Sequence, residues 1–333
     1  MILLLGGSGY IGSSFASALR LRGIPFAAPS RREADYTRFS TLHSLLKSTH
    51  AEFIINAAGY TGRPNVDACE LDKASTLLGN TVFPVTVAAA CESAGVPWAH
   101  VSSGCVYTGA KVLSGGLEKI EPDLTAPHLR PILRDASHRV HGWVESDPPN
   151  FSFRSPPCSF YSGSKALAEE ALAQFENVFI WRLRIPFDEY DNDRNYLSKI
   201  QRYPKVYDNF NSLSHRRDFV NACLDLWSRR ASFGIYNVTN PGYISTREVV
   251  ALIENILKPQ RRFEFWNSDD EFYRFAAKTP RSNCILDTSK LLAAGVQMRP
   301  VSEALDDALR RWNTGNSGGR NGAFPATSVV THS

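Results

Sequence analysis

The first half of the chain alternates short apolar runs with segments of helical periodicity. The apolar runs fall at 2–5, 25–30, 52–59 and 97–104, and the helical segments between them at 13–23, 42–49 and 74–95. Strands that are buried on both faces are continuous apolar runs, and parallel strands need a crossover that is usually helical. The pattern therefore predicts an α/β fold, a Rossmann-type doubly wound parallel sheet with a smaller C-terminal substrate domain.

The second half is less regular. We expect helices at 162–175, 194–203, 246–257 and 301–312, and strands at 178–184 and 233–240. Residues 110–150 are rich in Pro, Gly, Ser and His and predict a long insertion with short elements. These features predict a Rossmann domain over 1–185 plus about 218–240, a substrate domain over 186–217 plus 241–312, and a disordered tail over 313–333.

Composition narrows the class of protein. The 333 residues are 43% hydrophobic and 21% charged, with a formal net charge of +4 and no long basic run. Nucleic acid is therefore not expected as a partner. The apolar start meets glycines after five residues, so neither a signal peptide nor a membrane span is predicted. The six cysteines lack metal-site spacing, which favours free thiols, a cytoplasmic protein and no bound metal.

A glycine motif joins the first strand to the first helix. The stretch "GGSGYIG" supplies Gly6, Gly9 and Gly12, with Tyr10 and Ile11 between the last two. Glycines allow a tight turn and a close backbone approach, and the helix N-terminus attracts a pyrophosphate. Because of its strand-turn-helix context, the motif predicts dinucleotide binding.

The end of the second expected strand indicates which dinucleotide is bound. NAD sites usually carry an acidic residue there, whereas this chain has Ser30, Arg31 and Arg32. Paired guanidinium groups suit a 2′-phosphate, so NADPH is expected in preference to NAD. Solvated surface arginines remain an alternative reading of the pair.

Tyr161 and Lys165 open the helix expected at 162–175, where a spacing of four places both side chains on one face. A tyrosine titrates near ~10 and is a poor acid or base at neutral pH without help. A neighbouring cation favours the phenolate, so proton exchange with a carbonyl or alcohol oxygen becomes feasible. The pair alone is a common pattern, and it gains weight from the glycine motif before it.

Four motifs in order resemble the extended short-chain dehydrogenases/reductases that act on nucleotide sugars: the glycine loop, "NAAG" (56–59), "SSGCVY" (102–107) and "YSGSK" (161–165). The resemblance implies a catalytic set of Ser103, Tyr161 and Lys165. It also implies cofactor contacts from Ala57, Ala58, Gly59, Asn80, Tyr161 and Lys165. Asn80 is expected to order the loop around the cofactor, and Lys165 to contact the cofactor ribose. The segments "NAAGYTGRPNVDACE" and "PRSNCILDTSKL" are similar to the dTDP-4-dehydrorhamnose reductase branch.

Within that branch, most of residues 1–295 resembles the bifunctional 3,5-epimerase/4-reductases that make nucleotide-linked rhamnose in plants. The implied substrate is a UDP- or dTDP-linked 4-keto-6-deoxyglucose, and the implied epimerisation pair is Cys105 and Lys199. From the residues alone, Cys105 reads as core packing and Lys199 as a solvated side chain. Further expected substrate contacts are Thr61, Arg63, Asn65, Asn195, Arg281 and Asn283.

The connection between Cys105 and Tyr161 is much longer than in the plant-type enzymes, and the excess falls in 110–150. This difference leaves open a lid, an oligomer contact or a changed specificity loop. A 4,6-dehydratase is disfavoured because "SSGCVY" has no carboxylate. A reductase without epimerase activity and a non-catalytic regulatory subunit of the same fold remain alternatives. The nucleotide sugar is the expected partner, and a homodimer and a functional coupling to a 4,6-dehydratase are left open.

Overall fold

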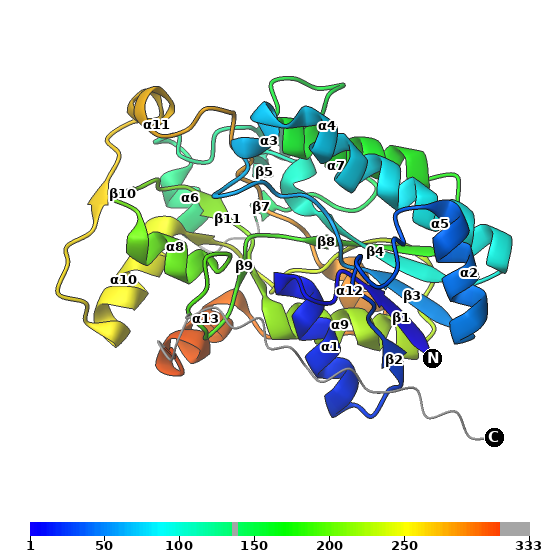
Figure 1. Cartoon of the computed structure of the whole chain (residues 1–333). Coiled ribbons are helices and arrows are strands. Elements are labelled where there is room, and N and C mark those ends of the chain that lie inside the picture. Colours follow the sequence, from blue (N-terminus) through cyan, green and yellow to red (C-terminus); the bar gives the residue numbers. More distant parts are fainter. Residues whose placement is uncertain (135–138, 314–333) are drawn as a thin grey trace.

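A computed structural model describes residues 1–134 and 139–313 (Figure 1). Its centre is a six-stranded sheet, in the order β13-β8-β4-β3-β1-β2, and every pair of neighbours is parallel. The strands are β1 (Ile2–Leu5), β2 (Phe26–Ala27), β3 (Phe53–Asn56), β4 (Trp98–Ser103), β8 (Val178–Leu183) and β13 (Gly234–Asn237). The expected Rossmann-type α/β fold is confirmed.

Helices cover both faces of this sheet (Figure 1). On one face, α1 (Tyr10–Leu21) contacts α9 (Arg216–Ser228), and both contribute to a core cluster around Phe15 and Trp181. On the other face, α2 (Phe39–Thr49), α5 (Phe83–Ala94) and α7 (Phe160–Leu172) enclose a second cluster. Burial on both faces explains why the strands are continuous apolar runs.

The helix expected at 74–95 is divided into three parts. A π-helical turn, η1 (Leu78–Val82), separates α4 (Lys73–Leu77) from α5. The wider turn carries the buried Asn80, whose side chain bonds the backbone of Tyr60, and π-bulges are often found at functional sites. The whole stretch Lys73–Ala94 is long and apolar enough to cross a membrane by length and composition, but half of it is buried within the protein, as in many core helices.

A separate hydrophobic cluster lies beyond the carboxyl ends of the strands. It joins α8 (Tyr196–Arg202), α10 (Thr246–Leu257) and α13 (Val301–Arg310). Short strand pairs border it: β9 (Pro186–Phe187) with β12 (Ser214–His215), β10 (Lys205–Val206) with β15 (Glu264–Phe265), and β11 (Phe210–Asn211) with β14 (Ile244–Ser245). The division into two domains at the expected boundaries stays a prediction.

The insertion at 110–150 contains a small antiparallel sheet. It is formed by β5 (Ala110–Ser114), β6 (Leu117–Glu121) and β7 (Val140–His141), with α6 (Arg130–Arg134) beside it. Its apolar side chains pack against Phe210, Tyr243 and Ile285. The remaining elements are α3 (Ala68–Leu71), η2 (Gly104–Val106), α11 (Asp269–Phe275) and α12 (Ser289–Ala293). Of the expected disordered tail, 314–333 lies outside the described residues.

Candidate active site

The glycine loop is tightly constrained at the N-terminus of α1. Gly6 has φ +77°, a conformation that favours glycine. A Cβ on Gly12 would lie 2.0 Å from the Gly6 carbonyl oxygen, and a Cβ on Gly6 would lie 2.7 Å from the nitrogen of Ala58. The loop therefore runs directly beside the segment that follows β3. Backbone amides at a helix start, left open by glycine, fit the pyrophosphate of a dinucleotide.

Arg216, the first residue of α9, connects the glycine loop to Asp188, which directly follows β9. The Arg216 guanidinium lies 4.4 Å from the centre of the Tyr10 ring, and its Nη1 donates to the Tyr10 carbonyl oxygen at 3.0 Å. Arg216 also pairs with Asp188 at 2.7 Å. Tyr10 and Ile11 form the first turn of α1, so the loop predicted to hold the cofactor is fixed from both sides.

Ser30, Arg31 and Arg32 lie in a turn just after β2. The Ser30 amide donates to the Glu33 carboxylate at 2.7 Å, and the Glu33 amide donates back to the Ser30 hydroxyl at 3.3 Å. This exchange fixes the turn and occupies its nearest carboxylate. Arg31 and Arg32 are exposed, and in residues 1–134 and 139–313 no carboxylate pairs with either. Both guanidinium groups are thus available for an anion.

The segment Ala57–Gly59 is held between β3 and α7 by Asn80. Its Oδ1 accepts from the Tyr60 amide at 2.8 Å, and its Nδ2 donates to the Tyr60 carbonyl at 2.8 Å and to the Ser164 hydroxyl at 3.2 Å. These bonds leave the amide group fully engaged within the protein. The geometry therefore agrees with the expectation that Asn80 orders the loop.

Ser103, Tyr161 and Lys165 are brought together at the carboxyl end of β4. The Ser103 hydroxyl is in hydrogen-bonding range of the Tyr161 phenol. The Lys165 ammonium donates to the Val101 carbonyl at 3.2 Å, and a Cβ on Gly59 would lie 3.6 Å from its Nζ. Ser159 caps α7 by accepting from the Ser162 amide at 3.1 Å, which sets the register of Tyr161 and Lys165.

Burial governs the protonation of this set. It raises the pKa of Tyr161, so the phenol is protonated at neutral pH and can donate a proton. Burial also lowers the pKa of Lys165 to about 8, so this group is still cationic at neutral pH but close to its titration. The arrangement can therefore give a proton to an oxygen held between Ser103 and Tyr161.

Cys105 lies in η2, directly after Ser103, and is buried. Its amide donates to the Ser103 hydroxyl at 3.2 Å. Burial raises the pKa of the thiol, whereas hydrogen bonds to Ser103 and Ser162 and the nearby cations lower it. The thiol thus shares Ser103 with the Tyr161 phenol, and the sequence-predicted cysteine belongs to the same cluster of side chains.

Lys199 lies on α8, which belongs to the separate hydrophobic cluster beyond the carboxyl ends of the strands. Burial and the neighbouring Arg194 charge lower the pKa of Lys199. In the described part of the chain no hydrogen bond joins Lys199 to Cys105. Arg194 connects the two sides, because it is close enough to Lys199, Arg63 and Tyr161 to interact electrostatically with each. The sequence analysis did not single out Arg194, although it directly precedes Asn195, an expected substrate contact.

The other expected substrate residues have mixed surroundings. Thr61 and Arg63 are exposed on the loop after β3, and Asn65 accepts from the Asp67 amide at 2.8 Å. Arg281 pairs with Asp67 at 2.7 Å in a bidentate contact. Asn195 is fully buried, caps α8 and donates to Asp188 and Tyr190, so its amide has no capacity left for a substrate.

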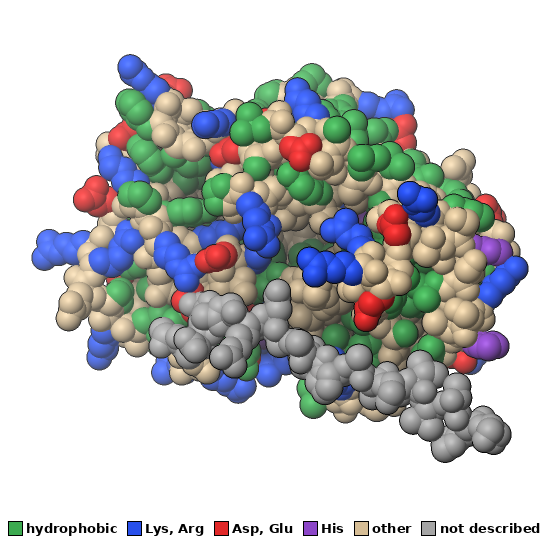
Figure 2. Space-filling view, viewed as in Figure 1, with side chains coloured by type: hydrophobic (Ala, Val, Ile, Leu, Met, Phe, Trp, Pro, Cys, Tyr) green, Lys and Arg blue, Asp and Glu red, His purple; other side chains and the backbone are tan. Residues whose placement is uncertain are grey.

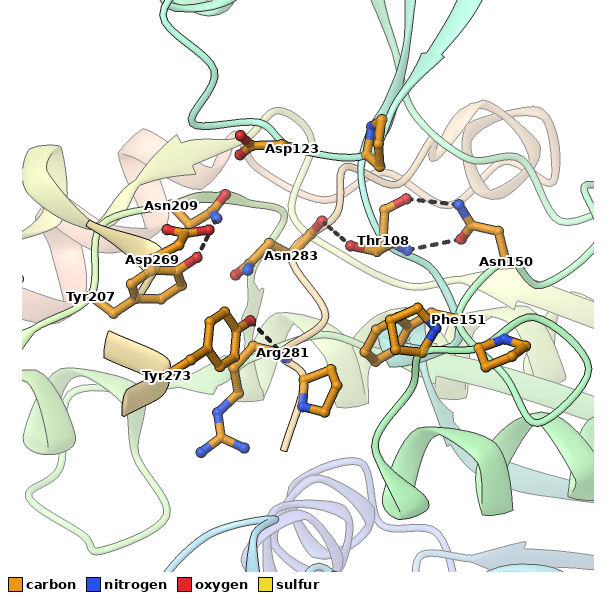
Figure 3. Close-up of a pocket in the computed structure, with 14 residues that line it drawn as sticks. Thr108, Asp123, Asn150, Phe151, Tyr207, Asn209, Asp269, Tyr273, Arg281 and Asn283 are labelled. Atoms are coloured by element: carbon orange, nitrogen blue, oxygen red, sulfur yellow. Dashed lines mark hydrogen bonds between the residues drawn. The ribbon is translucent and has the colours of Figure 1, made fainter. Parts of the chain in front are cut away.

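A cavity of ≈ 380 Å³ opens beside these loops (Figure 3). Tyr207 and Tyr273 form one side of it, and the Tyr207 ring stacks on Phe272 with 4.0 Å between centroids. Polar side chains complete its wall: Asp123, Asn150, Asn209, Asp269, Arg281 and Asn283. A hollow with Lys and Arg side chains along its rim is visible in the middle of the face shown in Figure 2. Aromatic rings and amides around a concave space suit a flat, polar ring such as a nucleobase.

Comparison with known proteins shows what this arrangement is similar to. The chain is 30% identical over 306 residues to the bifunctional dTDP-4-dehydrorhamnose 3,5-epimerase/dTDP-4-dehydrorhamnose reductase of Arabidopsis thaliana, covering 91% of this chain and 90% of the relative. It is 31% identical over 304 residues to a trifunctional dehydratase/epimerase/reductase of the same plant, of which it spans 41%.

Solved structures share the fold. The L780 UDP-rhamnose synthase of Acanthamoeba polyphaga mimivirus superposes with a TM-score of 0.77 at 21% identity, over 93% of this chain and 98% of that one. A dTDP-4-dehydrorhamnose reductase of Bacillus anthracis in complex with NADP gives 0.71 at 19% identity, over 93% and 97%. The family model described as the RmlD substrate binding domain matches residues 1–314. The chain therefore belongs to the RmlD substrate-binding domain family.

Proposed function

We propose that the protein is a nucleotide-sugar 4-keto reductase that also epimerises its substrate at C3 and C5. The substrate is a UDP- or dTDP-linked 4-keto-6-deoxyglucose, and the product is the corresponding rhamnose nucleotide. One observation carries this proposal: Ser103, shared by the Tyr161 phenol and the Cys105 amide and thiol, joins a reductase set to a candidate base. The bifunctional Arabidopsis relative, whose name includes both an epimerase and a reductase, supports this proposal.

The reductive half rests on the glycine loop and α7. NADPH, when bound, supplies the hydride for C4. Gly6, Gly9 and Gly12 leave room for its pyrophosphate, and exposed Arg31 and Arg32 suit its 2′-phosphate. Ser103 donates a hydrogen bond to the C4 oxygen and Tyr161 gives it a proton. Lys165 supplies positive charge near the phenol and so stabilises the phenolate that remains.

The epimerisation half uses the same oxygen position. The C4 ketone makes the protons on C3 and C5 acidic, and their removal leaves an enolate on the C4 oxygen. Cys105, as the thiolate, takes the proton from carbon and becomes a thiol. Lys199, as the ammonium, returns a proton to the opposite face and becomes an amine. Before the second carbon is inverted, the thiol gives its proton to solvent and the amine takes a proton from solvent. Ser103 and Tyr161 hold the enolate oxygen between the two transfers, so no oxidant or reductant is needed.

The cavity beside Tyr207 and Tyr273 is proposed to take the nucleotide part of the substrate. Its rings offer a stacking surface and Asn283 in its wall suits the base, whereas the guanidinium of Arg281 is paired with Asp67. Arg63 and Arg194, cations without a carboxylate partner in the described residues, lie towards Tyr161 and suit the diphosphate. Asn195 is not carried into this proposal, because its polar atoms are occupied.

The 4-keto substrate must be supplied by a 4,6-dehydratase, so functional coupling to such an enzyme forms part of the proposal. We also propose a cytoplasmic location, because cysteines stay reduced in that compartment and those of the described residues are free thiols. A reductase without epimerase activity is the second candidate, favoured by the raised pKa of the buried Cys105 thiol. A non-catalytic subunit is disfavoured, since binding alone does not require Ser103, Tyr161 and Lys165 together.

Incubation of the purified chain with UDP-4-keto-6-deoxyglucose and NADPH tests the proposal. With no other enzyme present, the product identified by NMR is expected to be UDP-rhamnose. A 6-deoxy sugar product that keeps the D configuration would support the reductase activity and contradict the epimerase activity. Both activities would be contradicted if no NADPH were consumed with this substrate or with its epimerised form. The two sugars are to be tested as UDP and as dTDP derivatives.

A further inference from the structure

Two buried arginines lie two positions apart at the end of β8, and they have opposite surroundings. Arg182 pairs with the buried Glu169, with Nη2 at 2.7 Å from Oε2. Arg184 is only 6% exposed, yet in residues 1–134 and 139–313 no carboxylate pairs with it. A buried guanidinium without an anion is costly, so its retention calls for an explanation.

Among the described residues, the side-chain hydrogen bonds of Arg184 go to neutral groups. Its Nη2 donates to the Asn211 side-chain oxygen and to the Ser282 carbonyl, and within residues 1–134 and 139–313 its Nε has no hydrogen-bond partner. Its backbone is fixed, because the Arg184 amide donates to the Ser214 hydroxyl at 3.1 Å and its carbonyl accepts from the Ser214 amide at 2.7 Å. The guanidinium is therefore held in place with its full charge uncompensated.

Arg184 lies against the turn that carries Cys105. A Cβ on Gly104 would be 3.6 Å from the Arg184 Cδ atom. On the other side of this turn, the Cys284 thiol donates to the Gly104 carbonyl at 3.3 Å. Four groups that can become anions are within electrostatic range of the guanidinium: the thiols of Cys105 and Cys284 and the phenols of Tyr161 and Tyr196.

We propose that Arg184 is a positioning residue for epimerisation: its uncompensated charge stabilises the thiolate of Cys105, the base of the proposed function on which this inference rests. The missing anion is then the thiolate itself, formed during the reaction. Arg184 touches neither the reacting carbon nor the hydride and acts through the cysteine. A permanent carboxylate at this position would cancel the charge, which explains why Arg182 has one and Arg184 does not.

All titratable neighbours of Cys105 enter the comparison. The cations are Arg184 and Lys165, and the other ionisable groups near it are Tyr161, Cys69, Cys158 and Cys284. Lys165 titrates with a pKa of about 8 and therefore loses its charge in alkaline solution. A guanidinium group keeps its charge in alkaline solution, so the test below addresses Arg184 and not Lys165.

The test titrates the Cys105 thiol without turnover. The rate of alkylation by iodoacetamide is measured against pH in the ligand-free protein, with the Cys105 peptide followed by mass spectrometry. Arg184→Gln removes the charge and is expected to slow alkylation at pH 7 about tenfold, equivalent to one pKa unit. The rates should converge at high pH, where every thiol is ionised. Arg184→Lys keeps the charge and should restore most of the rate.

Asn211→Asp keeps the arginine and gives it a carboxylate partner, so this variant stays informative if Arg184→Gln does not fold. If Arg184→Gln slows alkylation only because packing is lost, Asn211→Asp should react at the wild-type rate. If it slows alkylation because net positive charge is lost, Asn211→Asp should be slowed to the same degree. Arg202→Gln removes an exposed cation, paired with Asp191 and Asp193, and is the matched control. Equal alkylation profiles for wild type, Arg184→Gln and Asn211→Asp would overturn the inference. A folded Asn211→Asp whose profile matches wild type would by itself also overturn it.

A second readout separates this inference from the proposed function. Solvent deuterium entering C3 and C5 of the 4-keto sugar is measured without NADPH, and Asn211→Asp should lower its rate about tenfold at pH 7. If the Cys105→Ser variant incorporated deuterium at the wild-type rate, the epimerase function would be refuted. The thiol titration would still decide the role of Arg184. Lost exchange in Cys105→Ser together with unchanged thiol titration in Asn211→Asp would refute only the inference.

Discussion

Ser103, Tyr161 and Lys165 come from β4 and α7, two neighbouring elements of the central core, whereas Lys199 comes from α8 in the separate hydrophobic cluster. Ser103 is in hydrogen-bonding range of the Tyr161 phenol and also accepts from the Cys105 amide, while Lys165 donates to the Val101 carbonyl of β4. Among the described residues, Arg194 interacts electrostatically with both Lys199 and Tyr161. Inversion at carbon needs an acid and a base on opposite faces of the sugar. The proposed chemistry therefore needs Cys105 and Lys199 to face the bound sugar from opposite sides.

In the proposed function, the two activities use different parts of the molecule. Reduction uses the contact between β4 and α7. The proposed epimerisation uses, in addition, Lys199 on α8. Substitutions can therefore be chosen that affect one half of the site and spare the other.

The largest effect is expected from Tyr161→Phe. Removal of the proton donor should lower kcat/KM for reduction of the pre-epimerised 4-keto sugar by about 10²- to 10⁴-fold, the usual contribution of a general acid. NADPH consumption measures it. Tyr243→Phe is a suitable control, because its hydroxyl donates to the Leu133 carbonyl outside the site. A rate within threefold of wild type for Tyr161→Phe would exclude this tyrosine as the acid.

The next largest effect should separate the two halves. Cys105→Ser is expected to lower deuterium exchange at C3 and C5 by about 10²-fold or more, because a serine hydroxyl is a far weaker base than a thiolate. Reduction of the pre-epimerised sugar should stay within a few fold of wild type.

Cys284→Ser controls for the loss of a buried thiol, since serine can still donate to the Gly104 carbonyl. Equal loss of exchange in Cys105→Ser and Cys284→Ser would indicate disturbed packing of the Gly104 turn and not a missing base.

A smaller effect concerns the cofactor. Arg31→Ala with Arg32→Ala should reduce the preference for NADPH over NADH by about 10- to 100-fold, through a higher KM for NADPH, because charge-assisted contacts to the 2′-phosphate are lost. Steady-state kinetics with both cofactors give the ratio. An unchanged ratio would mean that these are solvated surface arginines.

The smallest effect is a difference in pH dependence. Lys165 must be cationic for reduction, and its pKa of about 8 means that kcat/KM for reduction falls as pH rises through that value. Cys105 must be a thiolate for exchange, and burial raises its pKa, so exchange increases with pH over the same range. Profiles of the two rates measured on one preparation should therefore slope in opposite directions. Parallel slopes would contradict this assignment of charges.

The central sheet could be predicted because strands buried on both faces leave continuous apolar runs. The π-turn at Asn80 could not, since one extra residue in a helical turn barely changes the spacing of apolar positions. Ser103, Tyr161 and Lys165 stood out through their motif context. Lys199 did not, because a single lysine on a helix is usually solvated.

Arg184 and Asn195 show the limits of reading polar residues from a sequence. The stretch "VFIWRLRIPF" places two arginines in an apolar strand, which signals buried charge, but only the fold shows that one has a carboxylate and the other has none. Asn195 looked like a substrate contact and is a helix cap, because the cap is defined by backbone geometry.

The most direct test of the account is the isotope content of the product formed in deuterated water with NADPH. If one site performs both activities, the rhamnose nucleotide carries deuterium at C3 and C5 and protium at C4, since the hydride comes from the cofactor. A reduced product with protium at all three carbons would contradict the central claim that Cys105 and Lys199 act on the sugar that Tyr161 protonates.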